Sequence, residues 1–496
     1  MAMASESHIL CLLLFLFPLS ITAQTKGRIT LGSSLSTLEE NTSWASPSGE
    51  FAFGFRRIAD TNLYLLATWF DKIPNKTITW YPTPSNTDPT VQTGSEVKLT
   101  SDGQLVLSDQ NGQEIWSAET SNVSYAAMLD TGNFVLASNG SSYLWQSFDH
   151  PSHTLLPGQV LDPSNSLFSH QSDSNYSIGK FQLQMLNGNV VLNPIALPTK
   201  NSYDAYWTST NTQGSGSSLS FDLSGYVYIE MWNGSSVNLT SGDTSTTKEF
   251  YQRVTLDPDG VLRKYIYPRN GTTGSWKPSW STSWWVPEDI CNSALVQIGS
   301  GICGFNSYCI LEDGRPTCGC PPMYSYLDPN NTRNGCKPDF IAQSCDTDAS
   351  EAGVTYVIQD LLGANWPTSD YERLTPMNEG DCRRACLEDC FCAVAIFGSA
   401  GCWKKKLPLS NGRGHENDAK ALIKVAVSIS SLPSPPQELL ERKRNRSKLI
   451  PVGAAMLGIS VLINLFLLSG IALSLLLPCC RKSKRLHQDS DCKRKT

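Results

Sequence analysis

The chain has 496 residues, with 39 Lys and Arg against 45 Asp and Glu, and a formal net charge of -6 at pH 7. Its sizeable cationic cluster flanks an apolar segment near the C-terminus, so the charge pattern argues against a nucleic-acid partner. Twelve of its 16 cysteines lie between Cys291 and Cys402, which is typical of an oxidising compartment.

Residues 1–23 are predicted to be a secretory signal peptide. Met1 to Ser7 is a short polar start, His8 to Leu19 is an apolar core, and small residues precede a cleavage site near Ala23. Cleavage there would place the chain outside the cell up to its membrane segment.

The cysteine-free stretch from Gln24 to Asp289 is predicted to be all-β. It is rich in Ser, Thr, Asn and Gly, has short alternating apolar runs, and lacks a sustained 3.6-residue periodicity. Turn dipeptides such as Asp102-Gly103 and Thr131-Gly132 are each followed by a similar strand, which indicates self-similar units. We therefore predict two β domains, at 24–150 and 151–286.

The twelve clustered cysteines predict two small modules held by disulfides, at 287–337 and 345–427. Such short modules bury too little apolar surface to be stable without cross-links. Many pairings of six cysteines exist, so the sequence alone leaves the connectivity open. Zinc binding is the competing interpretation, although Cys318-x-Cys320 does not match the usual ligand spacing.

Ten Asn-x-Ser/Thr triplets predict a glycosylated surface. They point to the secretory pathway, as the signal peptide and the cysteines do. The triplets begin at Asn41, Asn75, Asn122, Asn139, Asn175, Asn233, Asn238, Asn270, Asn330 and Asn445.

The C-terminal part of the chain predicts a membrane anchor. A Ser/Pro linker at 428–448 leads into an uncharged apolar segment, and 449–478 is long enough to span a bilayer as one helix. A basic cytoplasmic tail follows at 479–496, in which Cys479 and Cys480 are candidates for palmitoylation. Together with the signal peptide, this predicts a single-pass type I protein of the plasma membrane, with its N-terminal region extracellular.

No catalytic constellation is visible in the sequence. The six histidines are scattered, and neither a nucleophile elbow nor a metal-binding helix motif occurs. The tail after the membrane segment is too short to hold the loops of a kinase. We therefore expect no enzymatic activity, no cofactor and no metal site.

Two motifs resemble the signature of bulb-type lectin domains. One is Met128–Leu136, and the other is Trp145–Pro151 followed by Thr154–Gln159. With the cysteine patterns that follow, the chain resembles the plant G-type lectin S-receptor-like serine/threonine-protein kinases, here lacking the kinase domain. The resemblance implies a mainly β fold: tandem β-prism, bulb-type lectin-like domains followed by disulfide-rich EGF-like and PAN/apple-like modules and one transmembrane helix.

The resemblance also implies the disulfide pairing. The EGF-like pattern gives Cys291–Cys309, Cys303–Cys318 and Cys320–Cys336. The PAN-like pattern gives Cys382–Cys402, Cys386–Cys392 and, by remainder, Cys345–Cys390. The PAN-like module further implies a surface for protein contact or self-association, and the basic run Lys404 to Lys406 is either part of it or a solvated face.

The family's mannose-binding strands carry Gln, Asp, Asn, Val and Tyr at alternate positions, so all five side chains face one side of the strand. One strand here retains Asn133 and Val135, and another retains Asp102 and has Gln104 at the Asn position. The resemblance thus implies that Asp102, Gln104, Asn133 and Val135 are remnants of carbohydrate-binding sites. The alternative is that Asp102, Asn133 and Val135 now serve turns and core packing.

These observations predict a receptor-like protein whose ectodomain recognises an extracellular carbohydrate, glycoprotein or peptide ligand, in plant defence or cell-surface signalling. It would act through a partner kinase, as a homo- or hetero-oligomer at the membrane. The alternatives are a decoy or inactive truncated receptor, and a membrane-tethered mannose-type lectin.

Overall fold

The computed structural model describes residues 27–59, 61–83, 88–209, 212, 214–240, 246–269, 278–293, 299–345, 354–399, 401–415 and 419–426. The predicted signal peptide, linker, transmembrane helix and cytoplasmic tail lie outside these residues, as do Cys479, Cys480 and the triplets at Asn270 and Asn445. Within the described ranges, no helix is both long enough and apolar enough to cross a membrane.

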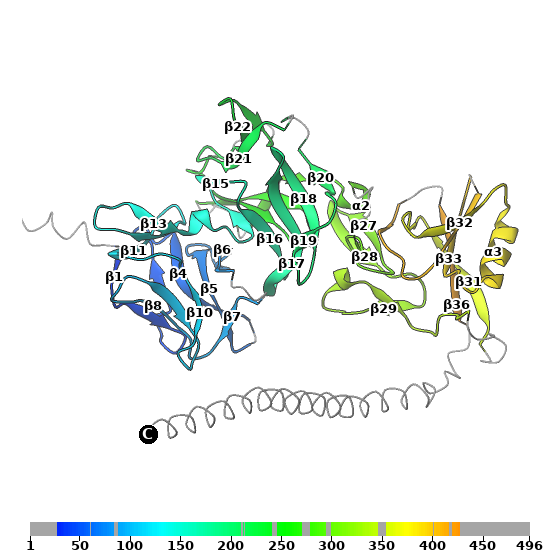
Figure 1. Ribbon diagram of the computed structural model, residues 1–496, viewed down its shortest axis with the longest axis horizontal. Coiled ribbons are helices and arrows are strands. Elements are labelled where there is room, and N and C mark those ends of the chain that lie inside the picture. The colour runs from blue at the N-terminus through cyan, green and yellow to red at the C-terminus, as the bar shows by residue number, and fades with distance from the viewer. Residues whose placement is uncertain are drawn as a thin grey trace, which may run out of the picture. The chain divides into compact units, whose positions relative to one another are not determined.

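Three antiparallel sheets from residues 28–146 surround one core and form the first β region (Figure 1). In sheet order, the strands are β1 (Arg28–Thr30), β11 (Tyr125–Met128), β12 (Phe134–Ala137) and β13 (Tyr143–Gln146); β10 (Glu114–Ser117), β9 (Leu105–Ser108), β8 (Glu96–Leu99) and β2 (Ser34–Ser36); and β3 (Ser43–Ala45), β4 (Phe51–Arg57), β5 (Leu63–Phe70) and β6 (Ile78–Trp80), with β7 (Thr90–Gln92) also on β5. Alternation on β4 directs Phe53 into the core, where it stacks on Phe134 with ring centroids 3.8 Å apart. Three sheets around one core is the arrangement that a β-prism requires.

Three further sheets from residues 154–286 form the second β region. Their strands are β14 (Thr154–Leu155), β24 (Phe250–Leu256), β25 (Leu262–Pro268) and β26 (Ser281–Val286); β15 (Gln159–Leu161), β21 (Gly216–Phe221), β22 (Val227–Met231) and β23 (Ser236–Asn238); and β16 (Ser166–Ser172), β17 (Asn175–Leu186), β18 (Asn189–Ala196) and β19 (Asn201–Ser202), with β20 (Trp207–Thr208) also on β18. Phe181 and Phe221 are fully buried in a separate core. The same three-sheet plan therefore occurs twice in the chain.

The two β regions are joined by packing as well as by the chain. Tyr251 and Tyr267 of the second region belong to the core of the first, and Tyr251 contacts Phe70 with ring centroids 5.5 Å apart. Trp280 donates from Nε1 to Thr77 Oγ1 at 2.8 Å. Burial of these rings removes a large apolar area from water, so the contact stabilises the pair of regions.

The remaining described residues form two cysteine-rich modules. The first contains α2 (Ile290–Ser293), β27 (Tyr308–Glu312), β28 (Arg315–Gly319), β29 (Tyr324–Tyr326), the 3₁₀ turn η2 (Thr332–Asn334) and β30 (Cys336–Pro338). The second contains β31 (Tyr356–Leu362), β32 (Asp370–Leu374), α3 (Glu379–Glu388), β33 (Val394–Gly398), β34 (Gly401–Lys405), β35 (Gly412–Arg413) and β36 (Lys420–Ala426). Its five-stranded sheet has the order β31-β36-β33-β34-β32, and Cys382 and Cys386 on α3 pack against that sheet.

Six disulfides stabilise these modules, and they coincide with the pairs that the resemblance implies. They join Cys291 to Cys309, Cys303 to Cys318, Cys320 to Cys336, Cys345 to Cys390, Cys382 to Cys402 and Cys386 to Cys392. Cys318 and Cys320, considered above as zinc ligands, are therefore each part of a disulfide.

The two cysteine-rich modules share a strand pairing. β27 of the first pairs in parallel with β35 of the second, with Tyr308 opposite Gly412. The buried Trp366 donates from Nε1 to the Ser307 carbonyl at 2.7 Å, beside this pairing. The modules are thus connected by backbone hydrogen bonds between segments about a hundred residues apart in sequence.

The expectation of a solvated face at the basic run is wrong for Lys404 and Lys405, which are buried. Lys404 pairs with Asp389 and Glu372, while Lys405 pairs with Asp370 and donates to the Trp366 carbonyl. Buried ammonium groups need such partners, and the partners lie far away in sequence.

Candidate functional site

Asn133 and Val135, two of the four predicted sugar-binding residues, are buried in the first β region. Val135 is fully buried in β12. The Asn133 amide donates to Gln146 Oε1 at 2.8 Å, and its carbonyl accepts from Ser147 Oγ and the Phe148 N–H, both at 3.2 Å. These bonds fasten the 3₁₀ turn η1 (Ser147–Asp149) to β12, so both side chains serve the fold in this structure.

Asp102 and Gln104 lie instead in the exposed hairpin between β8 and β9. A hydrogen bond from Thr100 lowers the pKa of Asp102. The Thr100 hydroxyl oxygen accepts from the Gln104 N–H at 2.9 Å and closes the turn. The structure thus separates the four predicted residues into a buried pair and an exposed pair.

An outward face of β22 offers a different set of sugar-binding groups. Tyr228 and Glu230 alternate with the buried Val227 and Ile229, and together with the preceding Tyr226 they line a cavity of about 500 Å³. The Glu230 carboxylate is held by two hydroxyl donors on β21, from Ser218 at 3.4 Å and from Ser220 at 3.1 Å. We call Tyr226, Tyr228 and Glu230 the strand face.

The sequence around the strand face has an alternating pattern that differs in residue type from the mannose-binding strands. Tyr226-x-Tyr228-x-Glu230 follows a Ser224-Gly225 turn with the same alternation as the family's sugar strands. The residue types differ from the mannose set, so a search for that set passes over them. Asn238, which begins a glycosylation triplet, lies directly opposite Tyr228 on β23.

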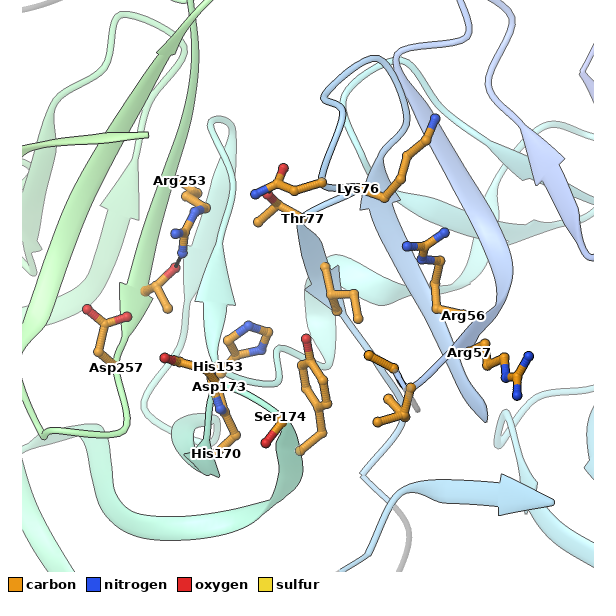
Figure 2. A pocket seen from close by; sticks show the side chains of 16 residues that line it. Arg56, Arg57, Lys76, Thr77, His153, His170, Asp173, Ser174, Arg253 and Asp257 are labelled. Atoms are coloured by element: carbon orange, nitrogen blue, oxygen red, sulfur yellow. Dashed lines mark hydrogen bonds between the residues drawn. The ribbon is translucent and has the colours of Figure 1, made fainter. Parts of the chain in front are cut away.

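A second cavity of about 410 Å³ lies between the two β regions (Figure 2). One wall comes from the end of β4 and from residues 75–78 of the first region. The other wall comes from β16, β17 and β24 of the second region. We call it the interface cavity.

Four rings cluster at one side of the interface cavity, and three of them, His153, His170 and Tyr176, line it. His153 stacks on Tyr81 and meets His170 edge-on, His170 stacks on Tyr176, and Tyr176 meets Tyr81 edge-on. The centroids of successive rings are 5.2–5.6 Å apart. Burial lowers the pKa of His153 well below its usual value and also lowers the pKa of His170. Both imidazoles are therefore neutral at pH 7.

This histidine pair predicts acid sensitivity. Histidine in the unfolded chain has a pKa of about 6.5. Below that pH the unfolded chain binds protons that the folded chain does not bind. The free energy of unfolding therefore decreases as the pH falls. Arg253 also disfavours both imidazolium forms, whereas Asp173 and Asp257 favour that of His170. Thermal unfolding followed from about pH 7 to about pH 5 should show a midpoint that decreases with pH.

The histidine pair can be separated from other acid-sensitive groups by substitution. His153→Gln should reduce the slope of the unfolding midpoint against pH, whatever it does to the midpoint itself. The matched change at the exposed His415 should leave the wild-type slope. An H153Q slope equal to that of the wild type would contradict the assignment.

Arg253 on β24 reaches into the interface cavity (Figure 2). Its guanidinium lies over the Tyr265 ring at 4.0 Å and near the Trp280 ring at 4.9 Å from the centroids. One nitrogen, Nη1, donates to Thr255 Oγ1 at 2.5 Å, while Nε is buried without a hydrogen-bond partner among the described residues. Rings and one hydroxyl thus hold the charge in place.

Known proteins are similar to the chain over nearly its whole length. A family described as D-mannose binding lectin matches residues 77–175. Over 480 residues, the chain is 41% identical to the G-type lectin S-receptor-like serine/threonine-protein kinase LECRK1 of Oryza sativa subsp. japonica, an alignment that covers 92% of the chain and 59% of that kinase. The chain is a homologue of the G-type lectin S-receptor-like kinases.

This homologue spans little more than half the length of the curated relatives it matches. The kinase RLK1 of Arabidopsis thaliana, in the same group, is 36% identical over 436 residues, which cover 82% of the chain and 51% of that kinase. Among solved structures, Colocasia esculenta agglutinin with mannose bound is 24% identical and covers 26% of the chain and 98% of its own, with a TM-score of 0.16.

All eight glycosylation triplets within the described residues begin at an exposed asparagine. They are Asn41, Asn75, Asn122, Asn139, Asn175, Asn233, Asn238 and Asn330. Asn75 lines the interface cavity and Asn238 lines the cavity at the strand face. A glycan at either position would stand at the entrance of a candidate site.

Proposed function

We propose that this homologue of the receptor-like kinases is a single-pass plasma-membrane protein whose extracellular part binds a carbohydrate or the glycan of a glycoprotein, in plant defence or another cell-surface signal. The strand face carries the proposal, because two tyrosines and a carboxylate line one cavity there. The match to a D-mannose binding lectin family and the similarity to receptor-like kinases support the same class of function.

The chemistry of a sugar ring suits the strand face. A pyranose has an apolar C–H face, which can lie on the ring of Tyr228, and several hydroxyl donors. The Glu230 carboxylate accepts from such donors, and charge-assisted hydrogen bonds are about twice as strong as neutral ones. Ser218 and Ser220 already orient that carboxylate, so less ordering is required on binding.

Replacing Tyr228 with Ala, or Glu230 with Gln, should weaken glycan binding by about tenfold or more, since each removes a central contact of the face. The full-length chain would be probed on an array of immobilised glycans, and the best ligand would then be titrated calorimetrically. Both substitutions would be made in a chain that also carries Asn238→Gln. That change removes any glycan opposite Tyr228 and keeps both tyrosines.

The matched control is Tyr143→Ala, because Tyr143 is 50% exposed on β13 of the other β region. It should bind as the unsubstituted chain does. Equal affinities for Y228A, E230Q and Y143A would exclude the strand face as the site. A folded N238Q chain that binds no glycan of the array would contradict carbohydrate recognition itself.

We further propose that the signal passes through a partner receptor kinase. The similarity to receptor-like kinases supports such a partner, since a co-receptor of this type would share the extracellular modules. Co-purification of the tagged chain from plant membranes should then recover a kinase, and Cys382→Ser, which breaks a buried disulfide, should lose it. Purification of the chain without any kinase would contradict this step.

A further inference from the structure

The cationic side chains that line the interface cavity differ in their partners. Lys76 pairs with Asp71 at 2.8 Å, and Arg57 donates from Nε to the Thr61 carbonyl at 2.8 Å. Both side chains extend away from Arg253 (Figure 2). The Arg56 guanidinium lies near the Trp69 ring, 5.4 Å from its centroid.

Arg253 differs from Arg56, which also has no carboxylate partner among the described residues, because one of its N–H groups is buried without a hydrogen-bond partner. No carboxylate of the described residues forms an ion pair with it within 4.0 Å, and Nε has no hydrogen-bond partner. A guanidinium has five N–H donors in a planar fork, of which the structure uses one, on Thr255. A buried N–H group without a hydrogen-bond partner is costly, so an oxyanion that reaches Nε would relieve that cost.

Two carboxylates narrow the class of that oxyanion. Asp173 and Asp257 also line the cavity, and Asp257 already accepts from Arg263 at 2.7 Å and from the Tyr265 hydroxyl at 2.6 Å. A multiply charged anion such as phosphate would be repelled by them. A ligand with one carboxylate and several hydroxyl donors would suit both the arginine and the acidic groups.

We propose that the interface cavity binds a sugar acid, with its carboxylate on the free N–H groups of Arg253 and its hydroxyls on the neutral polar lining. Asn75, Thr77 and Ser174 supply that lining. The volume of about 410 Å³ lies within the range of about 300–1,000 Å³ that small-molecule sites occupy. The two oxygens of a carboxylate match the arginine fork. This site is separate from the strand face, with which it shares no lining residue.

The test is calorimetric titration of the full-length chain, with its glycans trimmed by an endoglycosidase because Asn75 lies at the cavity. D-glucuronate should bind saturably, and D-glucose, which lacks the carboxylate, should bind about tenfold more weakly or not at all. Inorganic phosphate should also bind more weakly than glucuronate. Equal binding of glucose and glucuronate, tighter binding of phosphate, or no saturable binding of glucuronate would overturn the proposal.

Variants locate the binding. Arg253→Lys keeps the charge and removes the fork, and Arg253→Met removes both, so glucuronate affinity should decrease about tenfold in R253K and further in R253M. Arg384→Gln, at an exposed arginine that does not line the cavity, should bind as the wild type does. If R253M does not fold, the glucuronate affinity of R253K tests the role of Arg253. Unchanged affinity in a folded R253K chain would contradict the proposal. Tyr228→Ala should retain glucuronate binding, which distinguishes this site from the strand face.

Discussion

Replacing Trp366 with alanine is expected to lower the free energy of unfolding of the cysteine-rich modules by about 3–5 kcal/mol. The indole is 0% exposed, and its Nε1 donates to the Ser307 carbonyl of the other module at 2.7 Å. Its ring also meets Tyr308 edge-on, with centroids 6.1 Å apart. The substitution therefore leaves a large cavity and a buried carbonyl without its donor.

Denaturant unfolding combined with amide exchange would measure this effect. Exchange should accelerate most in β27 and β35, which lie beside the indole. The same substitution at Trp232, which is 77% exposed, should change stability by no more than about 0.5 kcal/mol and serves as the control. Comparable losses at the two sites would show that Trp366 does not join the modules.

Arg263→Met should cost about 3–5 kcal/mol of stability in the second β region. Arg263 is 3% exposed, and its Nη1 donates to Asp257 at 2.7 Å and to Asp259 at 2.8 Å. Methionine fills much of the same space but leaves two buried carboxylates without this cation. Burial and the nearby Asp259 already raise the pKa of Asp257, so loss of the arginine should increase its tendency to take up a proton.

Thermal and urea unfolding of R263M would be compared with Arg384→Met. Arg384 pairs with Asp381 on the surface and its side chain is 65% exposed, so that change should cost no more than about 1 kcal/mol. Because Asp257 should protonate more readily, R263M should lose less stability than the wild type does as the pH is lowered. An R263M chain as stable as R384M at neutral pH would refute the role of this ion pair.

The parts of the fold that could be predicted from sequence are those with local signals. Gly132 shows why: its φ of 88° belongs to a turn, and a Cβ there would lie 2.4 Å from Leu156 Cδ1. Glycine dipeptides therefore mark hairpins that the β regions contain. The cysteine spacings are equally local, but the pairing of the six disulfides is implied by the family resemblance and not by the spacings.

Features that depend on distant partners could not be predicted. The sequence around Lys405 predicts a surface cation, because its partners Asp370 and the Trp366 carbonyl are distant in the sequence. Asn133 matches a sugar-binding position, but Ser147 and Phe148 engage its carbonyl in the folded chain. Arg253 gives no signal at all in the sequence, because its cavity is assembled from strands of two β regions.

The parallel pairing of β27 with β35 also has a mechanical meaning. The chain leaves the first cysteine-rich module at β30, and Gly412 returns to pair with Tyr308 of that module. The connection between the modules is therefore more than the covalent chain between them. Pulling the two modules apart would require breaking the backbone bonds at Tyr308 and Cys309 and the hydrogen bond of the Trp366 indole. These contacts therefore oppose separation of the two modules under load.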